Sequence, residues 1–145
     1  MDNELKNLQK TYHGKDGLVV KAVQDVSLSI PSNKIFGIIG KSGAGKSTLV
    51  RLISLLEKPD SGEVWYGDER VDNLSEKDLI KRRRRIGMIF QNFNLFSSRT
   101  AGENVAYPME ICRVSRDKIK ARVVEMLELV GLADRIDAPV STLSG

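Results

Sequence analysis

A glycine-rich loop that ends in lysine and serine is the part of the sequence with the clearest chemistry. Residues 40–47 read Gly-Lys-Ser-Gly-Ala-Gly-Lys-Ser and fit the pattern G-x-x-x-x-G-K-[ST] at every position. The glycines allow consecutive backbone N–H groups to curve around a phosphate, and a helix that follows adds its positive dipole end. A turn that merely connects a strand to a helix would not require Lys-Ser at its end. The pattern therefore predicts a phosphate-binding loop.

Each residue type in the loop has an expected role. We expect Lys46 to place its ammonium between the β- and γ-phosphates of a nucleotide, and the Ser47 hydroxyl to ligate Mg²⁺. Thr48 follows, where its hydroxyl can reach the α-phosphate side. The residues predicted to hold the nucleotide here are Gly40, Lys41, Ser42, Gly43, Ala44, Gly45, Lys46, Ser47 and Thr48.

The flanking residues predict the elements that must position this loop. Residues 26–30 alternate between apolar and polar types, as in a half-buried strand. Residues 34–39 are nearly continuously apolar, which predicts a strand buried on both faces that leads into the loop. After the loop, one helical face carries Leu49, Leu52, Ile53 and Leu56.

The remaining chain predicts further short elements. A strand is expected over Glu63–Tyr66, a polar helix over Ser75–Arg84 and an apolar strand over Ile86–Phe90. A longer amphipathic helix should run from a cap at Ser115 to the helix-ending residue Gly131. The sequence therefore reads as one α/β domain in two parts, residues 1–91 with the β-structure and the loop, and residues 92–145 with the helices.

Composition bounds the class of protein. The chain has 145 residues, 41% of them hydrophobic, and a net charge of +4, which is ordinary for one globular domain. No apolar run approaches the roughly 18 residues of a membrane-spanning helix, and the acidic N-terminus does not resemble a signal peptide. A single cysteine, Cys112, predicts a reducing, cytoplasmic setting. The basic run Lys81–Arg85 is interpreted as a solvated helix end, so no nucleic-acid partner is expected.

At this point the sequence resembles the nucleotide-binding domain of ABC transporters along its whole length. Besides the loop, Tyr12 lies where that family places an aromatic that stacks on adenine. Gln91 follows the strand at Ile86–Phe90, as does the family's Q-loop glutamine, which approaches Mg²⁺. Leu143-Ser144-Gly145 matches the start of the L-S-G-G-Q signature. The resemblance implies ATP and Mg²⁺ as cofactors, with Tyr12 and the loop holding ATP and with Ser47 and Gln91 at the metal. His13 and Trp65 are assigned to the surface and to sheet packing.

Within the family, residues 87–100 look most like ATPases of methionine importers. That resemblance implies an ATP-binding subunit at the cytoplasmic face of the cell membrane, which couples ATP hydrolysis to amino-acid import. A transmembrane permease subunit and a second copy of the ATPase are the expected partners. The permease chooses the solute, so the sequence does not establish it.

The resemblance also implies that the catalytic half of the family's domain, with the Walker B aspartate and the catalytic glutamate, lies beyond this sequence. We therefore expect residues 1–145 to bind nucleotide without hydrolysing it. Strands of that half would separate residues 35–39 from residues 86–90, so both segments should be exposed here and be covered by another copy. The alternatives are an inactive nucleotide-binding or interaction module and a small P-loop kinase, which would need an arginine-rich lid.

Overall fold

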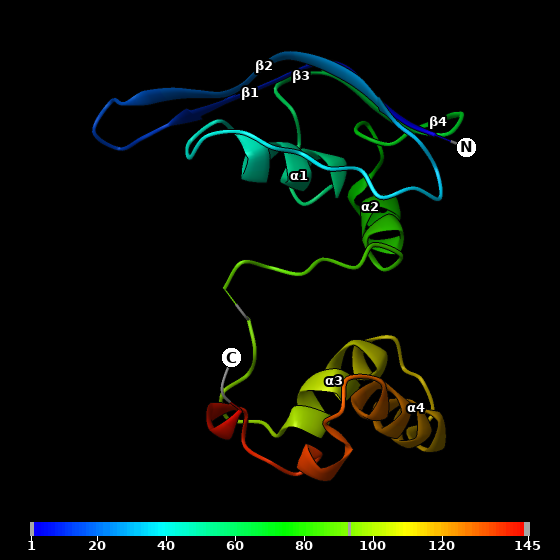
Figure 1. The fold of residues 1–145 in the computed structure, drawn as a ribbon. Helices are drawn as coiled ribbons and strands as arrows, with labels where there is room; N and C mark the ends of the chain where they lie inside the picture. The colour runs from blue at the N-terminus through cyan, green and yellow to red at the C-terminus, as the bar shows by residue number, and fades with distance from the viewer. Residues whose placement is uncertain (1, 93, 144–145) are drawn as a thin grey trace. The chain divides into compact units, whose positions relative to one another are not determined.

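A computed structural model describes residues 2–92 and 94–143, and these form two compact units (Figure 1). The first unit extends to Met88 and contains the glycine-rich loop. The second begins at Ile89 and is helical.

The described residues of the first unit form one antiparallel sheet. Its strands are β1 (Asn3–His13), β2 (Val19–Ile30), β3 (Ser61–Tyr66) and β4 (Glu69–Arg70), in the order β2-β1-β3-β4. The strands predicted over residues 26–30 and 63–66 are confirmed as parts of β2 and β3. β1 was not predicted, because its buried residues Leu5 and Leu8 are three apart across a register shift, which breaks the period-two alternation of a strand.

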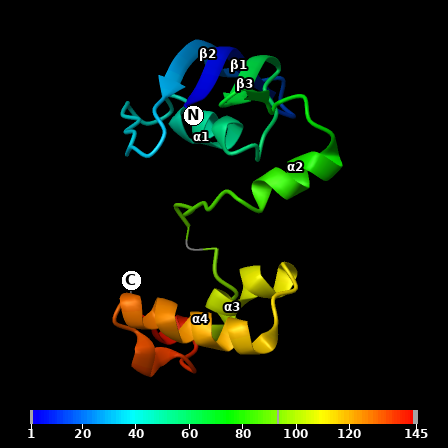
Figure 2. The ribbon, with the colours of Figure 1, turned by 90° about the vertical axis from the view of Figure 1, so that its right-hand side faces the viewer.

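Helix α1 (Lys46–Ile53) follows the loop and lies along one face of this sheet (Figures 1 and 2). Its apolar stripe buries Leu49 and Leu52 as predicted, whereas Leu56 lies beyond the end of the helix and is exposed. The core between helix and sheet consists of Leu5, Leu8, Val23, Leu49, Leu52, Leu55, Val64, Val71 and Leu79. Each large side chain buried in this way stabilises the fold by about 1.5–3 kcal/mol. The packing therefore fixes α1, and with it the loop, against the sheet.

Two side chains anchor the carboxyl end of α1. The Tyr66 hydroxyl on β3 donates a hydrogen bond to the carbonyl oxygen of Ile53. Burial raises the pKa of Tyr66 to about 12, so its hydroxyl keeps the donated proton at neutral pH. Arg83 donates from Nε to the carbonyl oxygen of Leu55 at 2.7 Å. These bonds satisfy carbonyl groups at a helix end that would otherwise lack partners.

Helix α2 (Glu76–Arg83) confirms the polar helix predicted in this region. Ser75 caps it by accepting a hydrogen bond from the N–H of Asp78 at 3.3 Å. The basic run at its end is partly neutralised, since Lys81 pairs with Asp78 and Arg82 pairs with Glu69.

The strands predicted over Lys34–Ile39 and Ile86–Phe90 are wrong as strands, because neither segment has strand structure. Exposed fractions are 104% for Ile35, 96% for Ile39 and 99% for Ile89, which confirms the expected exposure of both segments. A strand forms only where a neighbour takes up its N–H and C=O groups. The described residues offer these segments no such neighbour, so the apolar pattern alone does not make them strands.

The second unit is built on two helices, α3 (Ala101–Ile111) and α4 (Arg116–Leu129), which pack side by side (Figure 2). Two short 3₁₀ turns follow, η1 (Ala133–Arg135) and η2 (Val140–Thr142). α4 confirms the helix predicted between Ser115 and Gly131. The core of this unit consists of Ala106 of α3 and Val123 and Leu127 of α4.

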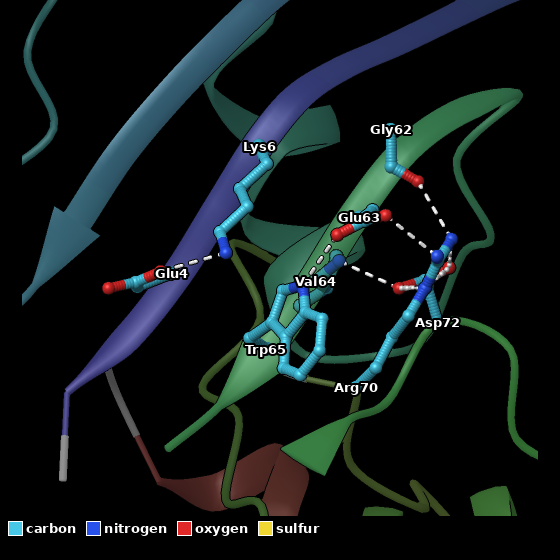
Figure 3. A network of polar contacts seen from close by, with 8 residues as sticks. All are labelled: Glu4, Lys6, Gly62, Glu63, Val64, Trp65, Arg70 and Asp72. Carbon is cyan, nitrogen blue, oxygen red and sulfur yellow. Dashed lines mark hydrogen bonds and ion pairs between the residues drawn. The ribbon is translucent and has the colours of Figure 1, made fainter. Parts of the chain in front are cut away.

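A polar network stabilises the edge of the sheet at β3 and β4 (Figure 3). The Asp72 carboxylate accepts a hydrogen bond from the N–H of Val64 at 2.8 Å and pairs with Arg70 at 3.0 Å. Arg70 also pairs with Glu63 at 2.7 Å, and Glu63 accepts from the indole N–H of Trp65 at 2.8 Å. The Asp72 side chain is only 8% exposed. Its carboxylate accepts the hydrogen bond that a carbonyl of a neighbouring strand would otherwise accept from the N–H of Val64.

We predict that Asp72→Ala will lower the free energy of unfolding by about 1–3 kcal/mol, because the buried N–H of Val64 loses its acceptor. The measurement is urea unfolding followed by the fluorescence of Trp65, the single tryptophan. Lys6→Met is the matched control, because Lys6 pairs with Glu4 on the exposed surface and lies over the Trp65 ring. Equal midpoints for Asp72→Ala and the unmodified chain would contradict this role.

Candidate phosphate-binding site

The glycine-rich loop adopts the curved conformation that its sequence predicts. Gly43 and Gly45 have φ values of 78° and 84°, on either side of Ala44. The N–H of Ala44 donates to the carbonyl oxygen of Lys41 at 3.2 Å, which closes the turn. Among the described residues, none accepts a hydrogen bond from the N–H of Gly45, Lys46 or Ser47. Alternating backbone conformations with free N–H groups form a concave donor surface for an anion.

Gly45 is pressed against β2. A Cβ atom at this position would lie 2.0 Å from the carbonyl oxygen of Ala22, far inside van der Waals contact. Gly45 is also the N-cap residue of α1, and its carbonyl oxygen accepts the first helical hydrogen bond from the N–H of Leu49 at 2.8 Å. The loop and the start of the helix are therefore held directly on the sheet.

The Lys46 side chain lies across the loop. Its ammonium donates to the carbonyl oxygens of Gly40 and Lys41, both at 2.7 Å. These bonds hold its charge at the loop that precedes α1, and this charge adds to the positive dipole end of the helix. Ser47 and Thr48 lie in the first turn of the same helix, and the Ser47 side chain is exposed.

A cleft of about 410 Å³ lies beside the loop, between it and β2. It is lined by Lys21, Ala22, Val23, Gln24, Val26, Ile38, Ile39, Gly43, Ala44, Gly45, Lys46 and Leu49. None of these described lining residues is acidic, and two are cationic. A larger groove of about 620 Å³ lies in the second unit, but Glu103, Glu110 and Asp137 line it beside Arg116 and Lys120. The smaller cleft is the better match to a polyphosphate, because its charges have one sign.

Tyr12 lies near the end of β1, where it pairs with Val20 of β2. Its ring is half buried, and the ammonium of Lys10 lies 5.6 Å from the ring centroid. The Tyr12 hydroxyl is buried and has no hydrogen-bond partner among the described residues. Because Lys10 covers one face of the Tyr12 ring, an adenine can stack only on the other face.

The remaining predicted site residues belong to the second unit. Gln91 is exposed and has no regular secondary structure. Leu143 ends the η2 turn, and its N–H donates to the carbonyl oxygen of Val140 at 3.0 Å. Ser144 and Gly145, the rest of the predicted signature, lie outside the described residues.

Sequence reasoning missed Lys10, Lys21 and Gln24. Lys21 and Gln24 line the cleft from β2, and Lys10 contacts Tyr12. The signal for Lys10 was its position two residues before an aromatic, which places both on one face of a strand. No signal in the sequence identifies Lys21, because its place beside the loop depends on how β2 and α1 pack.

Comparison with known proteins places the chain in a family. A family model described as ABC transporter matches residues 23–145, and the chain therefore belongs to the ABC transporter family of ATP-binding domains. It is 54% identical over 141 residues to the methionine import ATP-binding protein MetN of Carboxydothermus hydrogenoformans. It is 49% identical over 142 residues to that of Escherichia coli K12. These matches cover 97% and 98% of the chain, which spans 41% of the length of each relative.

Solved structures confirm the predicted fold class, an α/β P-loop NTPase fold of ABC type. The ATP-binding cassette MJ0796, in a dimeric post-hydrolysis state bound to ADP and Pi, matches with a TM-score of 0.87 and 34% identity. A second dimeric structure of MJ0796, a bacterial ABC transporter cassette, matches with a TM-score of 0.88 and 34% identity. The matches cover 98% and 99% of this chain and 63% of those chains. None of the helices in the described residues is long and apolar enough to cross a membrane.

We predict that Gly45→Ala will disrupt the loop far more than Gly43→Ala. Both glycines have positive φ, so each alanine costs about 1–2 kcal/mol of backbone strain. Only the methyl group added in Gly45→Ala would overlap the carbonyl oxygen of Ala22. Nothing lies within 4 Å of a Cβ atom at Gly43. Urea midpoints and the dissociation constant of MgATP should both change more for Gly45→Ala. Equal losses for the two variants would contradict the close approach of loop and sheet.

Proposed function

We propose that this chain is part of the ATP-binding subunit of an ABC importer and that it binds ATP at the glycine-rich loop. The observation that carries this proposal is the loop itself, where the N–H groups of Gly45, Lys46 and Ser47 have no acceptor among the described residues and the Lys46 ammonium is bound to the loop carbonyls of Gly40 and Lys41. Such an arrangement binds a polyphosphate through directed hydrogen bonds and through charge. The family membership of the chain supports ATP as the ligand.

In this proposal, each site residue has one task. The free N–H groups of Gly45, Lys46 and Ser47 hold the β-phosphate, and Lys46 contacts the β- and γ-phosphates. Tyr12 stacks on adenine with the ring face that Lys10 leaves open. The exposed Ser47 hydroxyl is the proposed protein ligand of Mg²⁺ in the first unit, whereas Gln91 belongs to the second unit. This suits a hard cation that uses few protein oxygens and takes its other ligands from phosphates and water.

We propose that residues 1–145 alone bind ATP without turning it over. Hydrolysis requires an oriented water and a base near the γ-phosphate. No acidic side chain lines the cleft in the described part of the chain. The alternative of an inactive nucleotide-binding module makes the same prediction for this chain, and the two differ only in the transport activity of the whole protein.

The transported solute and the partners are further proposals. Identities of 49–54% to methionine import ATP-binding proteins support methionine or a related amino acid. The proposed partners are a transmembrane permease, at the cytoplasmic face of the cell membrane, and a second copy of the ATPase. The solved structures of MJ0796 are dimeric, which supports the second copy.

We predict that Lys46→Ala will weaken MgATP binding about 10- to 100-fold, because a charge-assisted contact to the phosphates is lost. Isothermal titration calorimetry of the 145-residue chain measures this. Lys34→Ala removes the same charge from an exposed position outside the loop and should leave the affinity unchanged. If Lys46→Ala bound MgATP as tightly as the unmodified chain, the proposed site would be wrong.

We also propose that the exposed apolar residues around Ile35 and Ile39 associate with a second copy of the chain. Both side chains are almost wholly exposed, and a segment with unpaired N–H and C=O groups is a template for strand pairing. Nearby Phe36 adds to this apolar surface.

Sedimentation velocity tests this association. We expect the 145-residue chain to form dimers or larger species whose population rises with concentration, and Ile35→Lys to shift it toward monomer. The exposed position of Ile35 makes the substitution compatible with the folded unit. A chain that stays monomeric at every concentration would contradict the proposal.

A further inference from the structure

Lys10 occupies a nearly buried polar node between β1 and the segment that follows α1. Its ammonium donates to the carbonyl oxygen of Lys58 at 2.9 Å. It also pairs with carboxylate oxygens of Glu57 and Asp60, both at 3.2 Å. The Lys10 side chain is 14% exposed, which is low for a lysine. Four groups therefore hold this ammonium in one place, namely a carbonyl, two carboxylates and an aromatic ring.

The ring is that of Tyr12. Lys10 and Tyr12 are two residues apart on β1, so their side chains leave the sheet on the same face. The ammonium lies 5.6 Å from the ring centroid, within the range of a cation–π contact. The backbone between them is fixed as well, because the N–H of Thr11 donates to Asp60 at 2.7 Å. Since the Tyr12 hydroxyl has no hydrogen-bond partner among the described residues, Lys10 supplies the polar contact that orients this ring.

The partners of Lys10 connect the ring to the phosphate loop. Glu57 and Asp60 follow α1, and the N–H of Glu57 donates to the carbonyl oxygen of Arg51 in that helix at 3.2 Å. The opposite end of α1 begins at the loop, where Gly45 is pressed against β2. A continuous set of contacts within the first unit thus runs from the loop through α1 to the Tyr12 ring.

Lys10 and Asp60 keep their charges at neutral pH. Burial by itself would lower the pKa of Lys10, but hydrogen bonds to Glu57 and Asp60 raise it above its ordinary value. The hydrogen bond from Thr11 and the pairing with Lys10 lower the pKa of Asp60. The positive charge of Lys10 is neutralised by the carboxylates of Glu57 and Asp60. Lys46 differs, because its partners are neutral backbone carbonyls.

We infer that Lys10 is a positioning residue for nucleotide binding: it orients the Tyr12 ring and sets its place relative to the phosphate loop. This inference rests on the proposed function, in which Tyr12 stacks on the base. Lys10 acts on the base-binding half of the site alone. Its loss should therefore weaken ligands that carry a base and leave ligands that consist only of phosphates unaffected.

The test compares MgATP with magnesium tripolyphosphate, which lacks the base, by calorimetry on the 145-residue chain. We expect Lys10→Met to weaken MgATP about 3- to 30-fold, a part of the stacking contribution, and to change tripolyphosphate binding less than about twofold. Methionine keeps the apolar stem and removes the charge. In a Tyr12→Ala background, Lys10→Met should have no further effect on MgATP, because it acts through the ring.

Lys6→Met is the matched control, because Lys6 lies on the same strand, pairs with Glu4 at 3.3 Å and covers the Trp65 ring. It should change neither affinity. Equal weakening of both ligands by Lys10→Met, or an undiminished effect in the Tyr12→Ala background, would show a general structural tie and overturn the inference. If Lys46→Ala weakens both ligands while Tyr12→Ala weakens neither, base stacking is wrong, and this inference fails while the phosphate site stands.

Should Lys10→Met not fold, as judged by the fluorescence of Trp65, Glu57→Gln provides the second variant. It removes one of the two carboxylates that hold the ammonium and keeps Asp60. The expected result is again a loss confined to MgATP, smaller than that of Tyr12→Ala. Unchanged MgATP affinity in Glu57→Gln, with Tyr12→Ala clearly weakened, would overturn the inference.

Discussion

The close approach of Gly45 to the carbonyl oxygen of Ala22 is the constraint on which the rest of the site depends. It leaves no room for a side chain, so the loop must pass over β2 with its own backbone exposed toward the cleft. The apolar face of α1 keeps that contact closed, because Leu49 and Leu52 are buried against the sheet. A phosphate-binding loop needs N–H groups that are fixed in advance, since flexible ones would lose entropy on binding.

A second constraint explains where the structure leaves the predicted pattern. The segments at residues 34–39 and 86–90 are as apolar as buried strands, yet neither is one. Hydrophobic pattern favours burial, but strand structure also requires a hydrogen-bonding neighbour at the right distance. The chain spans 41% of the length of its methionine-import relatives, and the structure describes no such neighbour for these segments. Both the exposure of these segments and their irregular backbone follow from the absence of a neighbouring strand among the described residues.

The contacts around Lys10 connect the two halves of the proposed nucleotide site, which do not contact each other directly in the described residues. The phosphate loop lies at the amino end of α1, and the ring of Tyr12 lies on β1. Ion pairs to Glu57 and Asp60 join β1 to the other end of the same helix. The loop is fixed by the contact of Gly45 with β2 and by the buried face of α1, and Lys10 fixes the ring of Tyr12 relative to it.

The sequence by itself determined the phosphate loop, α1, α2 and α4, because glycine spacing, capping residues and helical periodicity act over a few neighbouring residues. The sequence also contains a signal for the start of α3, because Thr100 and Glu103 have the spacing of a capping box. Only the tertiary structure decided the sheet order, the lack of strand structure at residues 34–39 and the contact of Lys10 with Glu57. These depend on pairings between residues far apart in the chain, and local pattern carries no information about which distant partner is present.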